Sequence, residues 1–546
     1  MATARTATAP TDGTDAAGAT EPLAGTPREI DGNLYPDCWG GFHSDRLVHP
    51  VDVSDWPVRI DSRRQLFLDD YLIAARDGLR RVLHRPGKHP RNPVMVGETA
   101  WEGGPRWGPV LAHVLRDART GRFRLWYRSR VRYEANGRTY SDPNLYAESA
   151  DGLRWERPNL GLFDWQGSRD NNIILPAGDL RGLIHRPQEA AAPWTAVWEH
   201  NSPARSPDGI TREGYHVYTS VDGIRWSYAH LSVPHGPRRP AAAGGSPLPL
   251  PRLGDTGHVR WDSGLRTFVC DAKGTVPRAG GDAVPTAGTP GGDGHHRFRL
   301  QMESDDLVHW SRPRVVAFPD RRDLAAGTIG FYGLLGTEYE SLRIGYLRAH
   351  RLDPWKRVDV QLVTSRDGRT WSRACDREVF LPLGPEGSWE PDYSEINHAG
   401  PLLVDDELWF FYRGSILERH RGTGPDLRKG LGLATLRRDG FASLAGGTGG
   451  GSVTTRPLTF TGRRLLVNAT AHAGGELRAE VLTHDGQPLP GFTATDCRAV
   501  REDSTAAPLA WSGGDVGHAR SDPGSVTPLR LRFHLTSADL FAFWVE

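Results

Sequence analysis

A seven-residue signature recurs four times in this chain and constrains the fold more than any other feature. Three copies read Ser-x-Asp-Gly-x-x-Trp, and one has Leu in place of Gly; they occupy 149–155, 220–226, 304–310 and 365–371. A fixed motif that returns at intervals of tens of residues is typical of repeat architectures. Each copy follows a run of β-forming residues and carries the Asp of a tight turn. The signature therefore predicts a repeated β-unit.

The repeated unit is about as long as one four-stranded blade, so the spacing predicts a β-propeller. We expect the Trp of each copy to be buried against the neighbouring unit. Strand-like runs and turns recur between the copies and give five blades, of which the second is the least distinct. The run at 64–73 precedes the first unit, and we expect it to pair with the last blade and close the ring.

The 546 residues divide into three predicted parts. Residues 1–25 are rich in Ala, Thr, Gly and Pro, which is typical of a disordered tail. Residues 26–440 carry the five-bladed β-propeller. Residues 441–546 contain short strand-like runs with a different pattern, which predicts a C-terminal β-sandwich. The fold class is therefore all-β, with a five-bladed β-propeller followed by a C-terminal β-sandwich.

Charge and hydropathy exclude several classes of partner. Lys+Arg number 67 against 66 Asp+Glu, so nothing favours binding to nucleic acid or to an anionic membrane. The apolar runs are shorter than the ~18 residues of a membrane span. The start of the chain lacks the pattern of a secretory signal, which predicts a cytoplasmic location. The four cysteines are far apart and form no metal-binding spacing, so we expect free thiols: Cys38, Cys270, Cys375 and Cys497.

Acidic residues near the ends of the innermost strands are the candidates for a catalytic site. Residues at the starts of these strands converge on one end of the central channel, whatever their sequence separation. Glu102 precedes the first inner strand, Asp255 starts that of blade three, and Glu390 starts that of blade five. Glycosidic bond cleavage needs one protonated and one ionised carboxyl, and crowding separates their pKa values. An acid at a strand start can also serve only to cap backbone N–H groups.

From this pattern we assign catalysis to Glu390 as general acid, Asp255 as an orienting or pKa-tuning carboxylate, and Glu102 as base or nucleophile. The Trp side chains that do not belong to the repeated motif offer stacking surfaces for sugar rings. Arg128 and Arg413 follow matching aromatic pairs and either bind substrate or form ordinary salt bridges. The full set of predicted substrate-binding residues is Asp392, Glu338, Trp107, His258, Arg128 and Arg413.

The sequence predicts no cofactor and no metal ligand in the active site. It contains no HExxH motif, no phosphate-binding Gly loop and no Ser nucleophile elbow. His258 and His398 lie close to the candidate acids, but a lone His near a pocket is more often a hydrogen-bonded core residue than a ligand. A structural Ca²⁺ ion in the central channel is compatible with the sequence, because backbone carbonyls and one His or Asp suffice to bind it.

The repeated turns and the five-unit pattern resemble those of the five-bladed propeller glycosidases, the superfamily of invertases, levansucrases and arabinanases. The stretches 66–73, 159–162 and 432–441 are similar to bacterial proteins labelled family 32-like glycosyl hydrolases. The resemblance covers about residues 60–546. It implies a glycoside hydrolase acting on an oligo- or polysaccharide.

The resemblance also bears on individual residues. Invertases carry an Arg-Asp-Pro motif for a transition-state-stabilising Asp and a Glu-Cys motif for the acid. The nearest matches here are Gly254-Asp255-Thr256 and Trp389-Glu390-Pro391. The invertase nucleophile motif Asn-Asp-Pro-Asn-Gly is absent from the N-terminal part. Fructoside specificity is therefore not implied.

Two other functions fit the same fold. A sugar phosphorylase or lyase would use an anion site, for which Arg128, Arg348 and Arg413 are candidates. A non-catalytic propeller that binds carbohydrate or protein would need no carboxylate chemistry at all.

Overall fold

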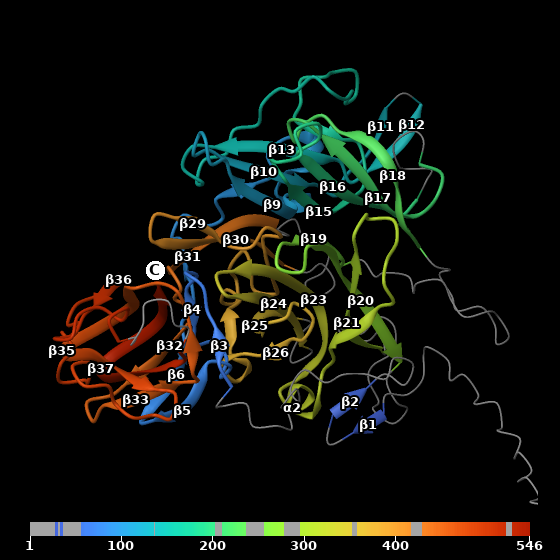
Figure 1. Ribbon diagram of the computed structural model, residues 1–546. Helices are drawn as coiled ribbons and strands as arrows, with labels where there is room; N and C mark the ends of the chain where they lie inside the picture. The colour runs from blue at the N-terminus through green and yellow to red at the C-terminus, as the bar shows by residue number, and fades with distance from the viewer. Residues whose placement is uncertain are drawn as a thin grey trace, which may run out of the picture.

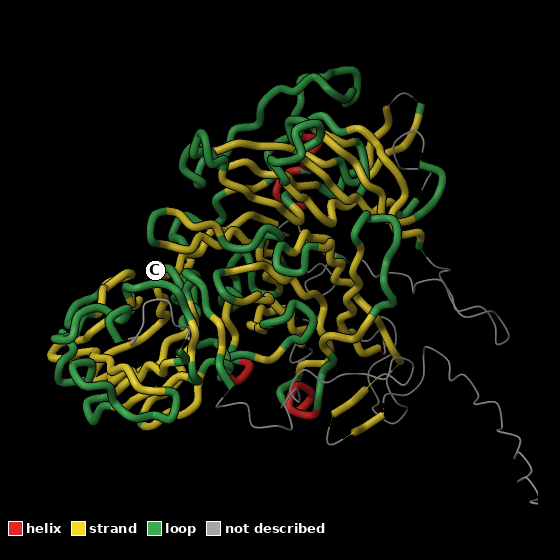
Figure 2. Tube along the Cα trace, viewed as in Figure 1, coloured by secondary structure: helices red, strands yellow, loops and turns green. Residues whose placement is uncertain are grey.

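The computed structural model describes residues 28–30, 33–35, 56–135, 137–202, 210–235, 256–277, 295–351, 357–416, 429–519 and 527–546. The regular secondary structure of this part of the chain is almost all β-strand, joined by loops, as Figure 2 shows, and its α-helices are two short ones, α1 (Gly104–Trp107) and α2 (Arg321–Ala325). None of the helices in these residues is long and apolar enough to cross a membrane. A small hairpin, β1 (Arg28–Ile30) with β2 (Asn33–Tyr35), precedes the main body.

The first three blades are separate four-stranded antiparallel sheets (Figure 1). Blade one contains β9 (Val110–Arg116), β10 (Phe123–Arg128), β13 (Asn144–Ser149) and β14 (Ile173–Leu175), with the hairpin β11 (Arg132–Ala135) and β12 (Arg138–Ser141) inserted after β10. Blade two contains β15 (Asp179–His185), β16 (Trp194–His200), β17 (Gly214–Ser220) and β18 (Ser227–Pro234). Blade three contains β19 (His258–Asp262), β20 (Thr267–Pro277), β21 (His295–Ser304) and β22 (Arg314–Ala317).

Blades four and five are joined through one parallel pair, Val358 with Tyr393. Blade four contains β23 (Thr328–Tyr339), β24 (Leu342–Arg351) and β25 (Arg357–Ser365), with β26 (Ser372–Arg373) and β27 (Val379–Leu381) on its outer edge. Blade five contains β28 (Tyr393–Ile396), β29 (Leu402–Val404), β30 (Glu407–Ser415) and β31 (Lys429–Arg437). Because β30 also contacts β9, the five blades form a closed ring. The predicted five-bladed propeller is confirmed.

The strand that closes the ring differs from the predicted one. The outer edge of blade five is formed by β7 (Gly87–Lys88) and β8 (Met95–Val96), which pair with β31. The predicted closing run at 64–73 instead supplies β4 (Gln65–Leu66) to the C-terminal sheet. Its side chains explain this choice, since Phe67 and Leu72 are buried in the core of that second domain.

The second domain is built from both parts of the chain that flank the propeller. Its strands from the N-terminal side are β3 (Val58–Arg59), β4, β5 (Ile73–Asp77) and β6 (Leu79–Leu83), drawn blue beside the red strands in Figure 1. The C-terminal strands are β32 (Ala442–Gly446), β33 (Gly451–Thr455), β34 (Leu458–Thr459), β35 (Leu465–Thr483), β36 (Ser504–Leu509) and β37 (Leu529–Val545). The sheet encloses one apolar core to which most of these strands contribute.

The four signature motifs form the same turn. In each, the Ser Oγ accepts a hydrogen bond of 2.8–2.9 Å from the N–H of the fourth residue. The Asp Oδ1 accepts two more from the next two N–H groups, at 2.7–2.9 Å. The fourth residue has a positive φ, which favours Gly, and Leu307 adopts 62° in the third copy. The Asp residues of the motif, such as Asp151 and Asp367, are therefore turn residues, as predicted.

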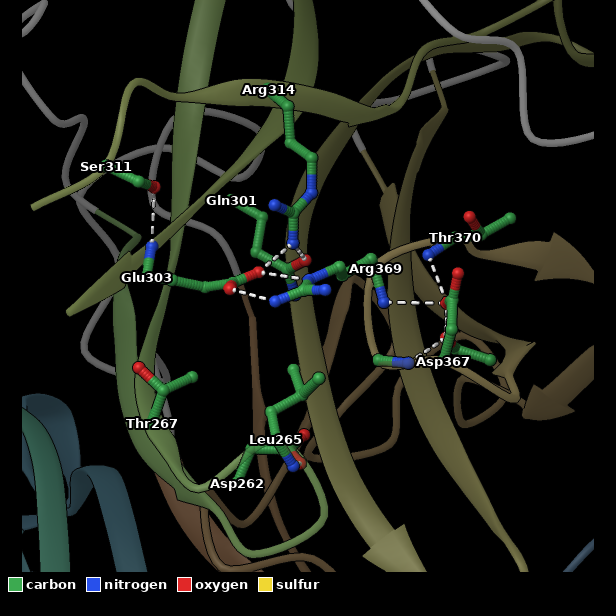
Figure 3. Close-up of polar contacts among 12 residues, drawn as sticks. Asp262, Leu265, Thr267, Gln301, Glu303, Ser311, Arg314, Asp367, Arg369 and Thr370 are labelled. Atoms are coloured by element: carbon green, nitrogen blue, oxygen red, sulfur yellow. Dashed lines mark hydrogen bonds and ion pairs between the residues drawn. The ribbon is translucent and has the colours of Figure 1, made fainter. Parts of the chain in front are cut away.

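An ion-pair cluster connects the last turn of blade four to blade three (Figure 3). Glu303 of β21 accepts hydrogen bonds from Arg369 Nη2 at 2.7 Å and from Arg314 Nη2 at 2.6 Å. The hydrogen bond from Arg369, together with that from Arg314, lowers the pKa of Glu303 despite its partial burial. Arg369 belongs to the signature motif, so the turn also holds neighbouring blades together.

The Trp of the fourth motif offers a test of the blade packing. Trp371 is 1% exposed and packs against Leu334 and Val363 of its own blade and Val316 of blade three. We expect Trp371→Ala to destabilise the protein by about 3–5 kcal/mol, because it leaves a cavity between two blades. The midpoint of thermal or urea unfolding measures this. The control is Trp56→Ala, since Trp56 is 59% exposed; equal midpoints for the two variants would contradict the packing described.

Candidate active site at the propeller axis

A small cavity of about 10 Å³ lies on the propeller axis, between the innermost strands of three blades. Blade three contributes His258, blade four contributes Arg348, and blade five contributes Glu395 and His398. The packing of these consecutive blades around the axis brings the residues together, although they are up to 140 positions apart in the sequence. The cavity is therefore the place where charged side chains of different blades meet.

Glu395 is the carboxylate of this cavity. Its Oε1 is paired with Arg348 Nη1 and lies 3.3 Å from His398 Nε2, and its Oε2 accepts a hydrogen bond of 3.1 Å from the Tyr393 hydroxyl. Burial alone would favour the protonated form. The charge of Arg348 and the contact with His398 outweigh burial and hold the pKa of Glu395 well below its usual range. Glu395 is ionised at neutral pH.

Three histidine rings gather beside Glu395. The ring centroid of His398 lies 4.9 Å from that of His113 and 5.1 Å from that of His258. His113 belongs to β9 and His258 to β19, so the three rings come from blades one, three and five. Burial lowers the pKa of all three histidines, and for His113 and His258 the neighbouring His398 lowers it further. The three rings are neutral at neutral pH.

The two arginines predicted to bind substrate both lie in ion pairs. Arg128 is paired with Asp179, and its Nη1 lies 3.5 Å from Asp142 Oδ2. Arg413 Nη1 lies 3.5 Å from Glu395 Oε2. Of the two alternatives given by the sequence, the geometry favours salt bridges. Arg413 nevertheless contacts the carboxylate of the axis cavity.

Glu390, the predicted general acid, lies over the middle and outer strands of blade five. Its Oε1 accepts hydrogen bonds from Lys88 Nζ of β7 at 2.7 Å and from the Tyr412 hydroxyl at 3.1 Å. Space for it comes from Gly414, where a Cβ would lie 2.7 Å from that of Glu390. Burial raises the pKa of Glu390, and Lys88 opposes the shift. The pKa suits an acid, but Glu390 does not line the axis cavity.

Glu102, the predicted base or nucleophile, is fully buried, and both of its carboxylate oxygens accept hydrogen bonds. Its Oε1 accepts hydrogen bonds from the Tyr127 hydroxyl at 2.6 Å and from Arg157 Nε at 2.9 Å. Its Oε2 accepts the backbone N–H groups of Glu98 and Thr99 at 2.9 and 3.0 Å, which caps the short helical turn Ala100–Glu102. Burial raises its pKa, but Arg157 and Tyr127 lower it more. These contacts are typical of a structural carboxylate.

The remaining predicted residues do not converge on one place. Glu338 lines a separate cleft of about 600 Å³ at the opposite ends of the inner strands, where its Oε2 accepts the backbone N–H of Ser263 at 2.9 Å. Asp392 is buried, and its carbonyl accepts the N–H of Val358 at 2.9 Å. Trp107 ends α1, and its side chain lies outside the described part of the chain. Asp255 also lies outside the described residues.

Sequence reasoning missed Glu395, Arg348 as its partner, and His113. Each lies inside a strand, whereas the predicted acids lie at or near strand starts. The available signal was the occurrence of charged or imidazole side chains within otherwise apolar strands, as in Tyr393–Ile396 and Val110–Arg116. Among the described cysteines, Cys270, Cys375 and Cys497 are free thiols, and Cys38 lies outside the described residues.

No protein-family model and no curated protein sequence matches this chain. Solved structures do match it. An N-acetylgalactosamine deacetylase from F. plautii, in complex with blood group B trisaccharide, has a TM-score of 0.38 and 14% identity over 67% of this chain and 97% of its own. A family 43 arabinoxylan arabinofuranohydrolase from Bacillus subtilis, in complex with cellotetraose, has a TM-score of 0.36 and 14% identity over 84% and 99%.

A further match is a putative glycoside hydrolase from Bacteroides ovatus, with a TM-score of 0.36 and 12% identity over 65% of this chain and 97% of its own. At these identities and TM-scores the likeness carries no information about activity. The function must be inferred from the residues at the axis.

The buried contacts of Glu102 predict a pH-dependent stability. We expect Glu102→Gln to lower the free energy of unfolding by about 3 kcal/mol at pH 7, because it removes the buried counter-charge of Arg157 and leaves only the exposed Glu98, at 3.1 Å. Since folding lowers the pKa of Glu102, the contribution is complete above the unfolded pKa of about 4.3 and is lost as the pH falls through the folded value.

Denaturant unfolding of the wild type and the variant between pH 7 and pH 3 measures this effect. Their difference should shrink towards acid. The matched control is Glu134→Gln, because Glu134 is exposed and its side chain accepts one hydrogen bond, from Thr139, at 2.6 Å. A difference between Glu102→Gln and wild type that is the same at all pH values would contradict the interpretation.

Proposed function

We propose that the protein is a glycoside hydrolase whose reactive site lies on the propeller axis around Glu395. The observation that supports this most directly is an ionised, buried carboxylate beside a cavity at the point where the blades converge. Hydrolysis of a glycosidic bond requires an ionised carboxylate as nucleophile or base. Arg348 and Tyr393 hold Glu395 in one orientation, which is the preorganisation that such a role needs.

The second carboxyl that the reaction requires is assigned to Asp255. It directly precedes Thr256 and Gly257 in the sequence, and both of these residues line the axis cavity. The sequence analysis assigned Asp255 as an orienting or pKa-tuning carboxylate of the site. In the proposal Asp255 keeps a place in the site, and Glu395 takes the role of base or nucleophile that was assigned to Glu102.

The location of the other buried acids supports this reassignment. Both carboxylate oxygens of Glu102 accept hydrogen bonds that stabilise the start of blade one. Glu390 contacts the closing strand β7 through Lys88. A carboxyl acts on a substrate only if it reaches the bond that breaks, so a raised pKa alone does not make Glu390 the acid.

The phosphorylase alternative is not favoured. It needs unpaired positive charge for an anion, but Arg128 is paired with Asp179 and Arg348 with Glu395. Arg413 lies beside Glu395 as well. A carbohydrate remains the proposed substrate, and hydrolysis the proposed reaction.

The test compares two matched variants, Glu395→Gln and Glu390→Gln. Wild type and variants are assayed on a panel of nitrophenyl furanosides and pyranosides and on natural oligosaccharides, with and without phosphate. We expect phosphate-independent hydrolysis by the wild type and a loss of about 100-fold or more in kcat for Glu395→Gln. Glu390→Gln should keep kcat within about tenfold, because Glu390 lies outside the axis cavity.

Circular dichroism and the unfolding midpoint of each variant show whether it is folded. Full activity of a folded Glu395→Gln variant would contradict the assignment of Glu395. Loss of activity confined to Glu390→Gln would return the catalytic role to Glu390. Turnover that requires phosphate would identify a phosphorylase instead of a hydrolase.

A further inference from the structure

The three histidines at the axis are arranged as metal ligands. One ring nitrogen of each of His113, His258 and His398 can be chosen so that all lie within 4.8 Å of one another. The side chains are only 2%, 5% and 6% exposed, respectively. The chain therefore brings three imidazoles from three blades to one buried point, which no local turn or cap requires.

Several of the imidazole nitrogens have no partner among the described residues. These are both ring nitrogens of His113, Nδ1 of His258 and Nδ1 of His398. Buried polar atoms are almost always hydrogen-bonded, and each exception needs an explanation. Four such atoms lie together in this one cluster, and a bound cation would provide a partner for each of the three rings.

We propose that His113, His258 and His398 bind a divalent transition-metal ion of the Zn²⁺ type on the propeller axis. Three histidine ligands and one open position form an established type of zinc site. With Zn–N bonds of 2.0–2.1 Å, tetrahedral ligand nitrogens lie about 3.4 Å apart, so binding would draw the three rings together by about 1 Å. The adjacent cavity of about 10 Å³ has room for one water molecule at the fourth position.

Glu395 orients one of the proposed ligands. His398 Nε2 lies 3.3 Å from Glu395 Oε1, which leaves Nδ1 of the same ring for the metal ion. A carboxylate bonded to the second nitrogen of a ligating histidine fixes its tautomer and strengthens the metal bond. The unpartnered Nδ1 is the nitrogen that this arrangement predicts to face the ion.

Carboxylates offset part of the positive charge around the three rings. Arg348 and Arg413 share Glu395, Arg181 is paired with Glu199, and Arg260 Nη1 lies 2.8 Å from Asp262 Oδ2. Each of these arginines therefore has a carboxylate partner, and Glu395 is the partner of two of them.

The donor set selects the kind of ion. Ca²⁺ binds six to eight oxygen ligands, whereas the described cluster offers imidazole nitrogens. The Ca²⁺ ion with which the sequence was compatible does not fit these residues. Zn²⁺, and Co²⁺ as its spectroscopic substitute, do fit them. The proposal does not depend on the glycosidase assignment, because it concerns binding alone.

The first experiment measures binding to the full chain. Protein is treated with EDTA, dialysed, and titrated with ZnCl₂ or CoCl₂, and bound metal is determined by mass spectrometry and by the visible spectrum of Co²⁺. We expect one ion per chain, with the intense spectrum of tetrahedral Co²⁺. His113→Ala should weaken binding at least 100-fold. The matched control is His200→Ala, a buried histidine whose Nε2 instead contacts the Tyr218 hydroxyl at 3.1 Å.

A second measurement needs no variant and so does not depend on a variant that folds. A ligand that binds only the folded state raises Tm, so ZnCl₂ should raise the Tm of the EDTA-treated wild type and CaCl₂ at equal concentration should not. Absence of stoichiometric Zn²⁺ binding, or an equal affinity of His113→Ala and wild type, would overturn the proposal. An equal loss in His200→Ala and His113→Ala would overturn it as well.

Discussion

The pairing of β31 with the segment that contains β7 and β8 is the interaction on which the architecture depends. It completes blade five with a strand from the N-terminal side and so removes the open edge of the ring. The N–H groups of His89 and Val94 extend this pairing with hydrogen bonds of 2.8 Å to the carbonyls of Leu433 and Leu431. The histidine cluster on the axis depends on the closed ring, because His113 of blade one lies there beside His258 of blade three and His398 of blade five.

The same segment connects the two domains. The chain runs from β3–β6 in the second domain through β7 and β8 into blade one, and returns from blade five to β32. The second domain thus contains strands from both sides of the propeller. In that domain β6, which directly precedes β7, pairs with β32, which directly follows β31. The closure of the propeller and the integrity of the second sheet are therefore coupled by chain connectivity.

The sequence was sufficient to predict the blades but not their closure. The Ser and Asp of the signature act locally, within four or five residues, so the turn and its position could be inferred from the sequence. The closing segment has His-Pro and Asn-Pro steps around Pro90 and Pro93, which interrupt the strand pattern. The run at 64–73 has a better strand pattern, but its apolar side chains fit a different core. Local pattern does not specify which edge a strand pairs with.

The sequence was equally insufficient to show which of the buried acids lines the axis cavity. Glu102, Glu390 and Glu395 are all almost fully buried, yet only Glu395 lines the axis cavity. In sequence, Glu390 and Glu395 are five positions apart on the way into the same strand. The difference arises from the partners, which are Lys88 of the closing strand for Glu390 and Arg348 of blade four for Glu395. Such long-range partners could not be deduced before the ring was known.

Glu395 connects the two proposals about the axis. It lies beside both Arg348 and Arg413 and contacts the imidazole of His398, so the axis carries the least excess positive charge while this carboxylate is ionised. Its protonation would leave Arg348 uncompensated beside three buried rings, which would weaken the binding of any cation there. A cation at the rings would in turn stabilise the ionised carboxylate. Metal binding and a reactive, ionised Glu395 would therefore reinforce each other at the same point of the fold.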